Sequence, residues 1–163
     1  GIINYEPRRI ALREVVDHVF RVLESRAAIK SQSLINEVEI ATEVYADKNM
    51  ISALLINLVN NGIKFTPQNG SIRVYTVTQN EKLKICVEDT GVGIEEENIP
   101  KLFRIDVSYQ RQGTEREPGT GLGLIMCKEY LSLMGETISV SSQVGKGTTI
   151  SFTVTPALSG AQV

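Results

Sequence analysis

The sequence of 163 residues has no tryptophan, a single histidine and only two cysteines, and its net charge is −2. With 17 basic residues against 19 acidic ones, it has no basic field to hold nucleic acid or an anionic membrane. The cysteines, Cys86 and Cys127, are far apart and lack the spacing of a zinc site, which favours reduced thiols. We therefore expect a cytoplasmic domain that contacts neither nucleic acid nor membrane.

Long apolar runs are also missing. The longest, from Met50 to Ile63, is interrupted by one serine and by asparagines, which excludes a membrane-spanning helix. No signal-peptide pattern opens the chain, and there is no initiator methionine, so we expect a fragment of a longer protein. The length fits one domain with a real core. We assign residues 1–157 to that domain and 158–163 to a flexible C-terminal tail.

Three stretches show helical patterns. Between residues 11 and 30, apolar side chains recur at helical spacing and charged ones occupy the opposite side. Asp47 can cap a second helix that runs to about residue 63 and ends at a turn cluster. A third helix is predicted from about residue 121 to about residue 134. We expect these helices to cover one face of a sheet.

Two predicted hairpins supply the sheet. Alternating apolar and polar residues indicate strands over 71–78 and 82–89, and again over 137–142 and 148–155. Between the hairpins, residues 95–118 are polar and without a clear period, which predicts a mobile loop, here called the lid. This order indicates an α+β fold: a two-layer sandwich whose mixed, mostly antiparallel sheet is covered on one face by about three helices.

The first of three short motifs ends the second helix, from Asn57 to Phe65. On a helix, Asn57, Asn61 and Lys64 project from one face, about a quarter-turn from the core stripe, so they should line its rim. Asparagine oxygens can bind Mg²⁺ when phosphate oxygens and water complete its shell, and the lysine adds a charge for a phosphate. The alternative is that Asn57 caps neighbouring backbone and Asn61 only helps to end the helix.

The second motif runs from Asp89 to Ile94. Period two places Asp89 on the same face as three aliphatic residues, where a carboxylate is costly unless it is hydrogen-bonded. Gly91 and Gly93 follow, where backbone can approach a flat ring. An adenine fits, because its exocyclic amine donates to a carboxylate, whereas guanine presents a carbonyl there. The alternative is an aspartate that merely begins a turn.

The third motif precedes the third helix and is rich in glycine: Gly119, Thr120, Gly121, Leu122, Gly123 and Leu124. Its spacing is not that of a Rossmann fingerprint, and the chain has no Walker sequence. Unhindered N–H groups at the positive end of a helix dipole favour anions. Because this motif closes a lid whose other end lies at the second motif, phosphate binding is favoured over a hinge or a packing point.

In this order the three motifs resemble the ATP-binding domain of bacterial sensor histidine kinases, within the gyrase-like ATPases. The resemblance covers about residues 8–156 and implies a Bergerat-type ATP-binding fold. It implies that Asn61, helped by Asn57, binds Mg²⁺ and that Lys64 binds phosphate. It also implies that Phe65 packs near the nucleotide and that Asp89 selects adenine.

The resemblance extends to the lid. Leu102, Phe103 and Arg104 look like the family's phenylalanine box, which implies that Phe103 lies at the nucleotide. Arg104 is then a candidate to contact the γ-phosphate as charge develops during transfer. Lys101 and Arg111 remain rivals for that role.

The last family box and two departures complete the comparison. Thr148 matches the last box, where it would support Asp89 and the adenine. Glu136 stands where the family usually shows a second glycine, and we see no reason for it to abolish nucleotide binding. His18 is followed by Val19, not by the acidic residue that follows the family's acceptor histidine, and it lies on a charged helix face. We interpret it as a solvated surface residue.

The resemblance implies a protein histidine kinase domain that requires Mg²⁺ and ATP. It would present the γ-phosphate to a histidine on a separate dimerisation and histidine-phosphotransfer domain of the same kinase, with a response regulator downstream. One alternative is a related serine kinase of the anti-sigma-factor type, with the same pocket and a different acceptor. Another is a scaffold that binds ATP without transfer. The intact asparagine, aspartate and glycine sets argue against a degenerate scaffold but do not distinguish the two acceptors.

Overall fold

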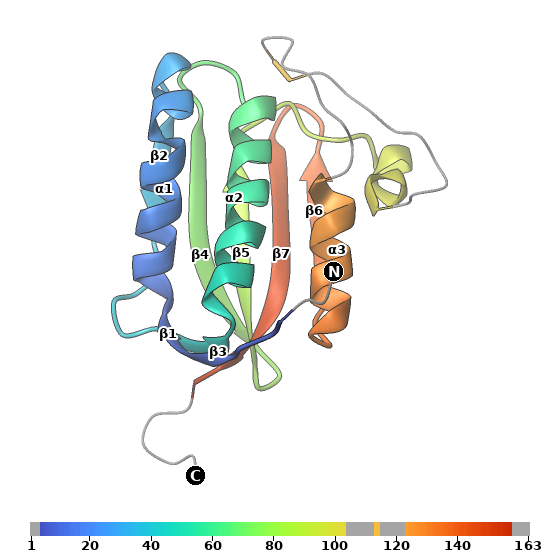
Figure 1. The fold of residues 1–163 in the computed structure, drawn as a ribbon. Coiled ribbons are helices and arrows are strands. Elements are labelled where there is room, and N and C mark those ends of the chain that lie inside the picture. Colours follow the sequence, from blue (N-terminus) through green and yellow to red (C-terminus); the bar gives the residue numbers. More distant parts are fainter. Residues whose placement is uncertain (1–3, 104–112, 115–122, 158–163) are drawn as a thin grey trace.

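The helices lie side by side over one face of a sheet (Figure 1). The computed structural model describes residues 4–103, 113–114 and 123–157. Within these ranges it contains α1 (Leu12–Ile29), α2 (Lys48–Phe65), α3 (Gly123–Leu133) and a 3-10 helix, η1 (Glu96–Phe103). The predicted α+β sandwich, with three helices on one face of its sheet, is confirmed. None of the helices described is both long and apolar enough to cross a membrane.

The sheet has seven strands and is mostly antiparallel. The strands are β1 (Arg8–Ala11), β2 (Ser33–Asn36), β3 (Glu43–Ala46), β4 (Ser71–Gln79), β5 (Lys82–Asp89), β6 (Ile138–Gln143) and β7 (Gly147–Pro156). Their order is β1-β3-β7-β5-β4-β2, and β6 also pairs with β7. Only the β2–β4 pair is parallel. The last strand, β7, is therefore hydrogen-bonded to three others: β3, β5 and β6.

The structure adds four elements to those predicted. The strands β1, β2 and β3 have four residues each, too few for an alternating pattern to stand out. The prediction of a single loop over 95–118 is wrong for residues 96–103, which form η1. Ile99 and Leu102 are three residues apart, the spacing that a 3-10 helix places on one face, and both pack on the core.

Asp47 begins α2, as predicted. Its Oδ1 accepts hydrogen bonds from the backbone N–H groups of Asn49 (2.9 Å) and Met50 (3.1 Å), and its Oδ2 accepts one from Glu6 (2.8 Å). Burial raises the pKa of this carboxyl, but these three donors outweigh burial and hold the pKa below its ordinary value. The cap therefore also ties the chain that precedes β1 to the start of α2.

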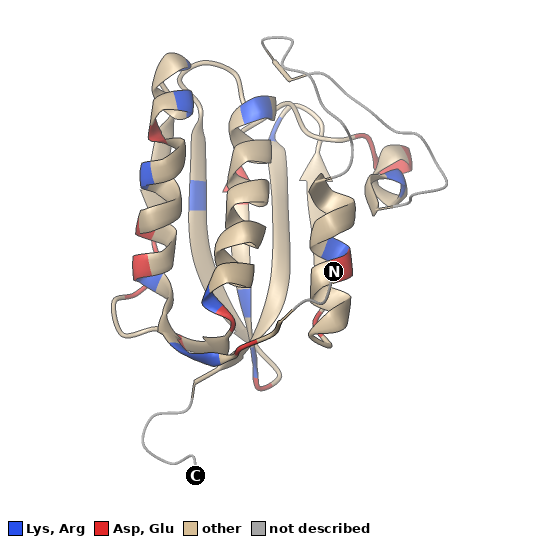
Figure 2. Ribbon diagram, in the orientation of Figure 1, with Lys and Arg blue, Asp and Glu red and all other residues tan. Residues whose placement is uncertain are grey.

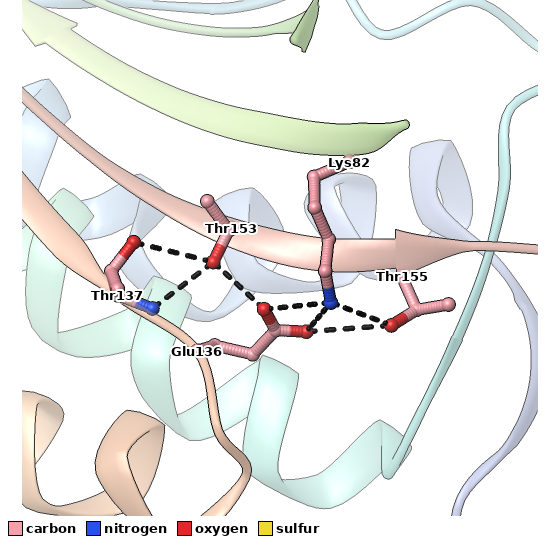
Figure 3. A network of polar contacts seen from close by, with 5 residues as sticks. All are labelled: Lys82, Glu136, Thr137, Thr153 and Thr155. Carbon is pink, nitrogen blue, oxygen red and sulfur yellow. Dashed lines mark hydrogen bonds and ion pairs between the residues drawn. The ribbon is translucent and has the colours of Figure 1, made fainter. Parts of the chain in front are cut away.

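Glu136, which stands where the family usually has a glycine, connects three elements through its side chain. Its side chain is 9% exposed and accepts two hydrogen bonds from Nζ of Lys82, at 2.9 and 3.0 Å. The hydroxyls of Thr153 (2.8 Å) and Thr155 (3.4 Å) donate to the same carboxylate (Figure 3). Glu136, three residues after the end of α3, thus binds the first residue of β5 and two threonines of β7.

Candidate functional site

The predicted stripe of α2 lies at the rim of the core. Asn57, Asn61 and Lys64 are all half-buried, as the helical spacing predicted. The Nδ2 group of Asn57 donates to the carbonyl of Ala53 (3.2 Å), one turn earlier. A Cβ added to Gly123 would lie 3.4 Å from Oδ1 of Asn57, so the start of α3 faces that oxygen. The first and third motifs therefore meet here.

Asp89 brings the second motif to the same helix. A Cβ added to Gly62 would lie 3.6 Å from Cβ of Asp89 and 3.1 Å from Cγ1 of Ile72. Glycine at position 62 thus lets the ends of β4 and β5 approach α2 closely. Asp89 points to the helix layer, as its place in the alternation predicted.

The carboxylate of Asp89 forms the turn contact considered from the sequence and a second contact to β7. Its Oδ1 accepts from the N–H of Gly91 (2.8 Å), the bond of a turn-forming aspartate. The same oxygen accepts from the N–H of Thr148 (3.2 Å), its partner in the β5–β7 register. Ser142 holds this corner from β6: its Oγ lies 2.7 Å from Oγ1 of Thr148 and accepts from the N–H of Ile94 (2.8 Å). The sequence carried no signal for Ser142.

At both glycines of the second motif, close packing within the protein leaves no room for a side chain. A Cβ on Gly91 would lie 2.5 Å from the carbonyl oxygen of Phe65. Gly93 has φ +79° and its added Cβ would meet the backbone of Gln143 and Val144. The N–H of Val92 also donates to the Phe65 carbonyl (3.1 Å). The loop after Asp89 is therefore held against the end of α2.

Two buried side chains hold the C-terminal end of α2, and the sequence analysis missed both. Nζ of Lys30, a residue that is 3% exposed, donates to the carbonyls of Ile63 (2.8 Å) and Lys64 (3.2 Å). Nε2 of Gln32 donates to the carbonyls of Ile63 (3.0 Å) and Thr66 (2.7 Å). A buried cation at a helix C-terminus is also favoured by the helix dipole. These contacts fix the backbone that carries Lys64 and Phe65.

The remaining predicted residues divide between described and undescribed parts of the chain. Phe65 is buried, and Nζ of Lys64 lies 5.5 Å from the centre of its ring. Phe103 packs on the core at the end of η1, and Leu124 is buried in the first turn of α3. Arg104, Arg111, Gly119, Thr120, Gly121 and Leu122 lie outside the described residues.

One short described piece of the lid contacts the same helix end. The N–H of Thr114 donates to the carbonyl of Lys64 (2.9 Å), and its hydroxyl donates to the carbonyl of Thr66 (3.1 Å). The rest of the predicted mobile lid beyond Phe103 falls outside the described residues. The second motif and the described end of the third thus meet the first motif on the second half of α2.

This donor set fits a magnesium nucleotide. Amide oxygens and an ammonium group lie on α2, and the start of α3 offers a positive dipole end for phosphates. The carboxylate of Asp89, at the end of β5, can accept a hydrogen bond from an amine.

The comparisons with known proteins show the family of the chain. The profile of a family described as "Histidine kinase-, DNA gyrase B-, and HSP90-like ATPase" matches residues 46–158, more than half of the chain. The chain belongs to this family. Its relatives within the family include proteins named as sensor histidine kinases.

Two such relatives cover almost the whole chain. The chain is 36% identical over 157 residues to the uncharacterized sensor-like histidine kinase R01002 of Rhizobium meliloti. This alignment covers 96% of the chain and 30% of that protein. The chain is 35% identical over 165 residues to the sensor histidine kinase RcsC of Escherichia coli, with 98% and 17% covered. The chain spans 19% to 39% of the length of the first three curated relatives that it matches.

Solved structures give the same family. The catalytic domain of histidine kinase ThkA, in a nucleotide-free form, superposes with a TM-score of 0.77 at 26% identity, covering 92% of this chain and 95% of that one. Full-length ShkA in complex with AMPPNP superposes with a TM-score of 0.81, covering 99% of this chain and 33% of that one. At 21% identity, the second likeness shows the fold alone.

Proposed function

We propose that this domain binds Mg²⁺-ATP and presents the γ-phosphate to a histidine on a separate dimerisation and histidine-phosphotransfer domain of the same kinase. The observation that carries the proposal is the convergence of Asn57, Asp89 and the first residue of α3 around the second half of α2. The names of the relatives and the AMPPNP bound to ShkA support it. The domain would act in the cytoplasm.

The residues of α2 would bind the metal and the phosphates. Asn61, helped by Asn57, would hold Mg²⁺, which supplies charge neutralisation to the phosphates when bound. Lys64 would contact a phosphate, and Phe65 would pack near the nucleotide. The N–H groups from Gly119 to Leu124 would hold phosphate oxygens at the start of α3.

The base would lie at the second motif. Asp89 would accept the adenine amine while Thr148 supports the carboxylate. Gly91, Gly93 and Ile94 would line the ring, and Phe103 would close the lid side. Arg104 would contact the γ-phosphate as charge develops. Phosphoryl transfer needs in-line positioning and charge stabilisation more than covalent chemistry, so the accepting histidine and its base can lie on another domain.

A response regulator would receive the phosphoryl group next. The structure of histidine kinase ThkA with the response regulator TrrA is a similar fold in such a complex, and it motivates this step. A serine acceptor of the anti-sigma-factor type would use the same nucleotide pocket. Only a transfer assay that offers each kind of acceptor separates the two.

Nucleotide selectivity tests the proposed pocket. The chain should bind ATP and ADP but not GTP, and Asp89→Ala should weaken ATP binding by on the order of 2 kcal/mol or more, because it removes a charge-assisted hydrogen bond. Isothermal titration would measure this. Glu88→Ala is the matched control, since Glu88 is the neighbouring carboxylate of β5 and is ion-paired to Arg73 (2.8 Å). Equal affinity for ATP and GTP would rule out the assignment of Asp89.

A further inference from the structure

A second concave region lies at the other end of the helix layer. It is a groove of about 790 Å³ between β1, α1 and the first turns of α2. Val15, Ala53 and Ile56 are among the apolar residues that line it. Lys48, which also lines it, is separated from Lys64 by about 24 Å of helix, given the rise of α-helices. The groove is therefore separate from the proposed nucleotide site.

Basic side chains dominate the charged lining of this groove. Arg8, Arg9, Arg21 and Lys48 line it, against a single carboxylate, Glu14. Figure 2 shows basic residues on β1 and on the first turn of α2, where both helices begin. The domain as a whole has a net charge of −2, so the positive charge is local to this surface.

Half of this charge is matched by carboxylates of the domain. Arg8 interacts electrostatically with Asp47 and helps to lower the pKa of that carboxyl. Arg9 has a carboxylate partner, Glu43, at 3.7 Å. Arg21 and Lys48 form no hydrogen bond or ion pair with the part of the chain that the structure describes. Asp47 lies beside Lys48, but its carboxylate is turned inward and bound by three backbone N–H groups. An anionic occupant would find Arg21 and Lys48 without competing carboxylates among the described residues.

The spacing of the cations indicates what kind of anion fits. Arg8 and Arg9 lie before α1 begins, whereas Arg21 lies nine residues after Leu12, or about 13 Å along the helix. One phosphate group cannot contact cations that far apart. A helix with carboxylates seven residues apart presents them at about 10 Å, and its other side can cover apolar residues.

We propose that this groove docks an acidic amphipathic helix from another protein domain. The half-buried apolar residues Ala11, Ala53 and Ile56 would contact the apolar side of that helix, and Arg8, Arg21 and Lys48 would pair with its carboxylates. Charge complementarity of this kind sets partner choice and association rate. His18 is exposed and also lines the groove, so the partner would cover it.

A designed peptide tests the groove directly. The probe is a fluorescent helical peptide of about four turns, made of alanine, leucine and glutamate with the glutamates on one side. It should bind the whole 163-residue chain. Binding should weaken as salt is added, and the amide resonances of Arg21, Lys48 and Ser52 should shift. The double variant Arg21→Glu/Lys48→Glu should lower the affinity by about ten-fold or more while ATP binding is retained.

Matched controls decide between outcomes. The variant Lys84→Glu/Lys128→Glu makes the same charge change elsewhere and should leave peptide affinity within about two-fold. An equal loss in both variants, or equal binding of a peptide with glutamine for glutamate, would overturn the proposal. So would no peptide binding at all. Tripolyphosphate that binds the same resonances more tightly than the peptide would mean that a small anion is the occupant, which also overturns it.

Discussion

Asn57 and Asn61 are neutral ligands, so on their own they offer a divalent cation little charge. Mg²⁺ binds few protein oxygens and completes its shell with phosphate oxygens and water. Asn57 also uses its Nδ2 group to bond the carbonyl of Ala53, which orients its oxygen toward the start of α3. The proposed metal should therefore bind only together with nucleotide.

The metal assignment predicts a linked loss. In the parent chain, ATP affinity should fall by roughly ten-fold or more when EDTA removes Mg²⁺, since the ion would join the phosphate oxygens to the asparagine oxygens of α2. In Asn61→Ala, ATP affinity should be low with or without Mg²⁺. Titration calorimetry in both conditions measures this. Asn60→Ala is the control, because Asn60 bonds Arg26 on α1 instead (2.9 Å). No response of the parent chain to EDTA would contradict the assignment.

Cys127 gives a pH-dependent prediction. Burial in α3 raises the pKa of its thiol from 9.0 to about 12. Between these values the thiol ionises in the unfolded chain but not in the folded one. The contribution of the neutral thiol to the free energy of unfolding is therefore fully present below about pH 9 and is lost as the pH rises toward about 12. A shift of this size predicts a loss of roughly 1.4 kcal/mol between about pH 8 and about pH 10. Urea denaturation should show a shallower pH dependence for Cys127→Ala, and parallel curves would contradict the prediction.

At the scale of elements, α2 is held at both ends by side chains that lie outside it. Asp47 caps its start, and Lys30 and Gln32, which follow α1, bond its last carbonyls. Lys30→Met should lower the free energy of unfolding by on the order of 2 kcal/mol, because buried carbonyls lose a charged donor. It should also weaken ATP binding, since the same backbone carries Lys64 and Phe65. Lys128→Met, on the exposed side of α3, should change neither.

Denaturation and ATP titration of both variants separate two explanations. If Lys30→Met keeps the parent's ATP affinity under conditions where it is fully folded, the contacts of Lys30 stabilise the domain without positioning the site. A loss of affinity in the folded variant supports the positioning role. Gln32→Leu should act in the same direction, because it removes a second donor to the carbonyl of Ile63.

The sequence predicted the elements that have a long period and missed the contacts between distant residues. The three helices and two hairpins were predicted because each extends over ten or more residues, enough for its apolar period to show. The three motifs lie on these elements or next to them. The short strands β1 to β3 and the helix η1 offered too few repeats. Lys30 and Gln32 were missed because their partners lie thirty or more positions away, and Ser142 was missed because its contact with Ile94 spans 48 positions; contacts this distant leave no local signal.

At the scale of the whole molecule, the proposed reaction needs a second domain. His18 is exposed near the first half of α1, beside the groove, whereas Asn61 and Lys64 lie at the far end of α2. Incubated alone with labelled Mg²⁺-ATP, the chain should form no acid-labile phosphohistidine. Adding the dimerisation and histidine domain of its parent should restore transfer weakly, because tethering normally supplies the effective concentration.

The same transfer assay can test the proposed role of Arg104. Arg104→Ala should reduce transfer more than it reduces ATP binding, if Arg104 acts mainly on charge that develops during transfer. Phosphate that appears on the isolated chain and disappears in His18→Ala would contradict the two-domain proposal. Transfer to a serine of the added domain would favour the serine-kinase alternative.

The position of β7 in the sheet has a consequence for how the protein is made. Because β7 pairs with β3, β5 and β6, three strands that are synthesised earlier lack a neighbour until residues 147–156 leave the ribosome. Thr148, which bonds Asp89, arrives with the same strand. A nascent chain therefore joins its two partial sheets, β1–β3 and β2–β4–β5, and forms the contact between Thr148 and Asp89, only after β7 has left the ribosome. Chains that stop before residue 147 would consequently expose the strand edges of β3 and β5 that β7 covers in the folded domain.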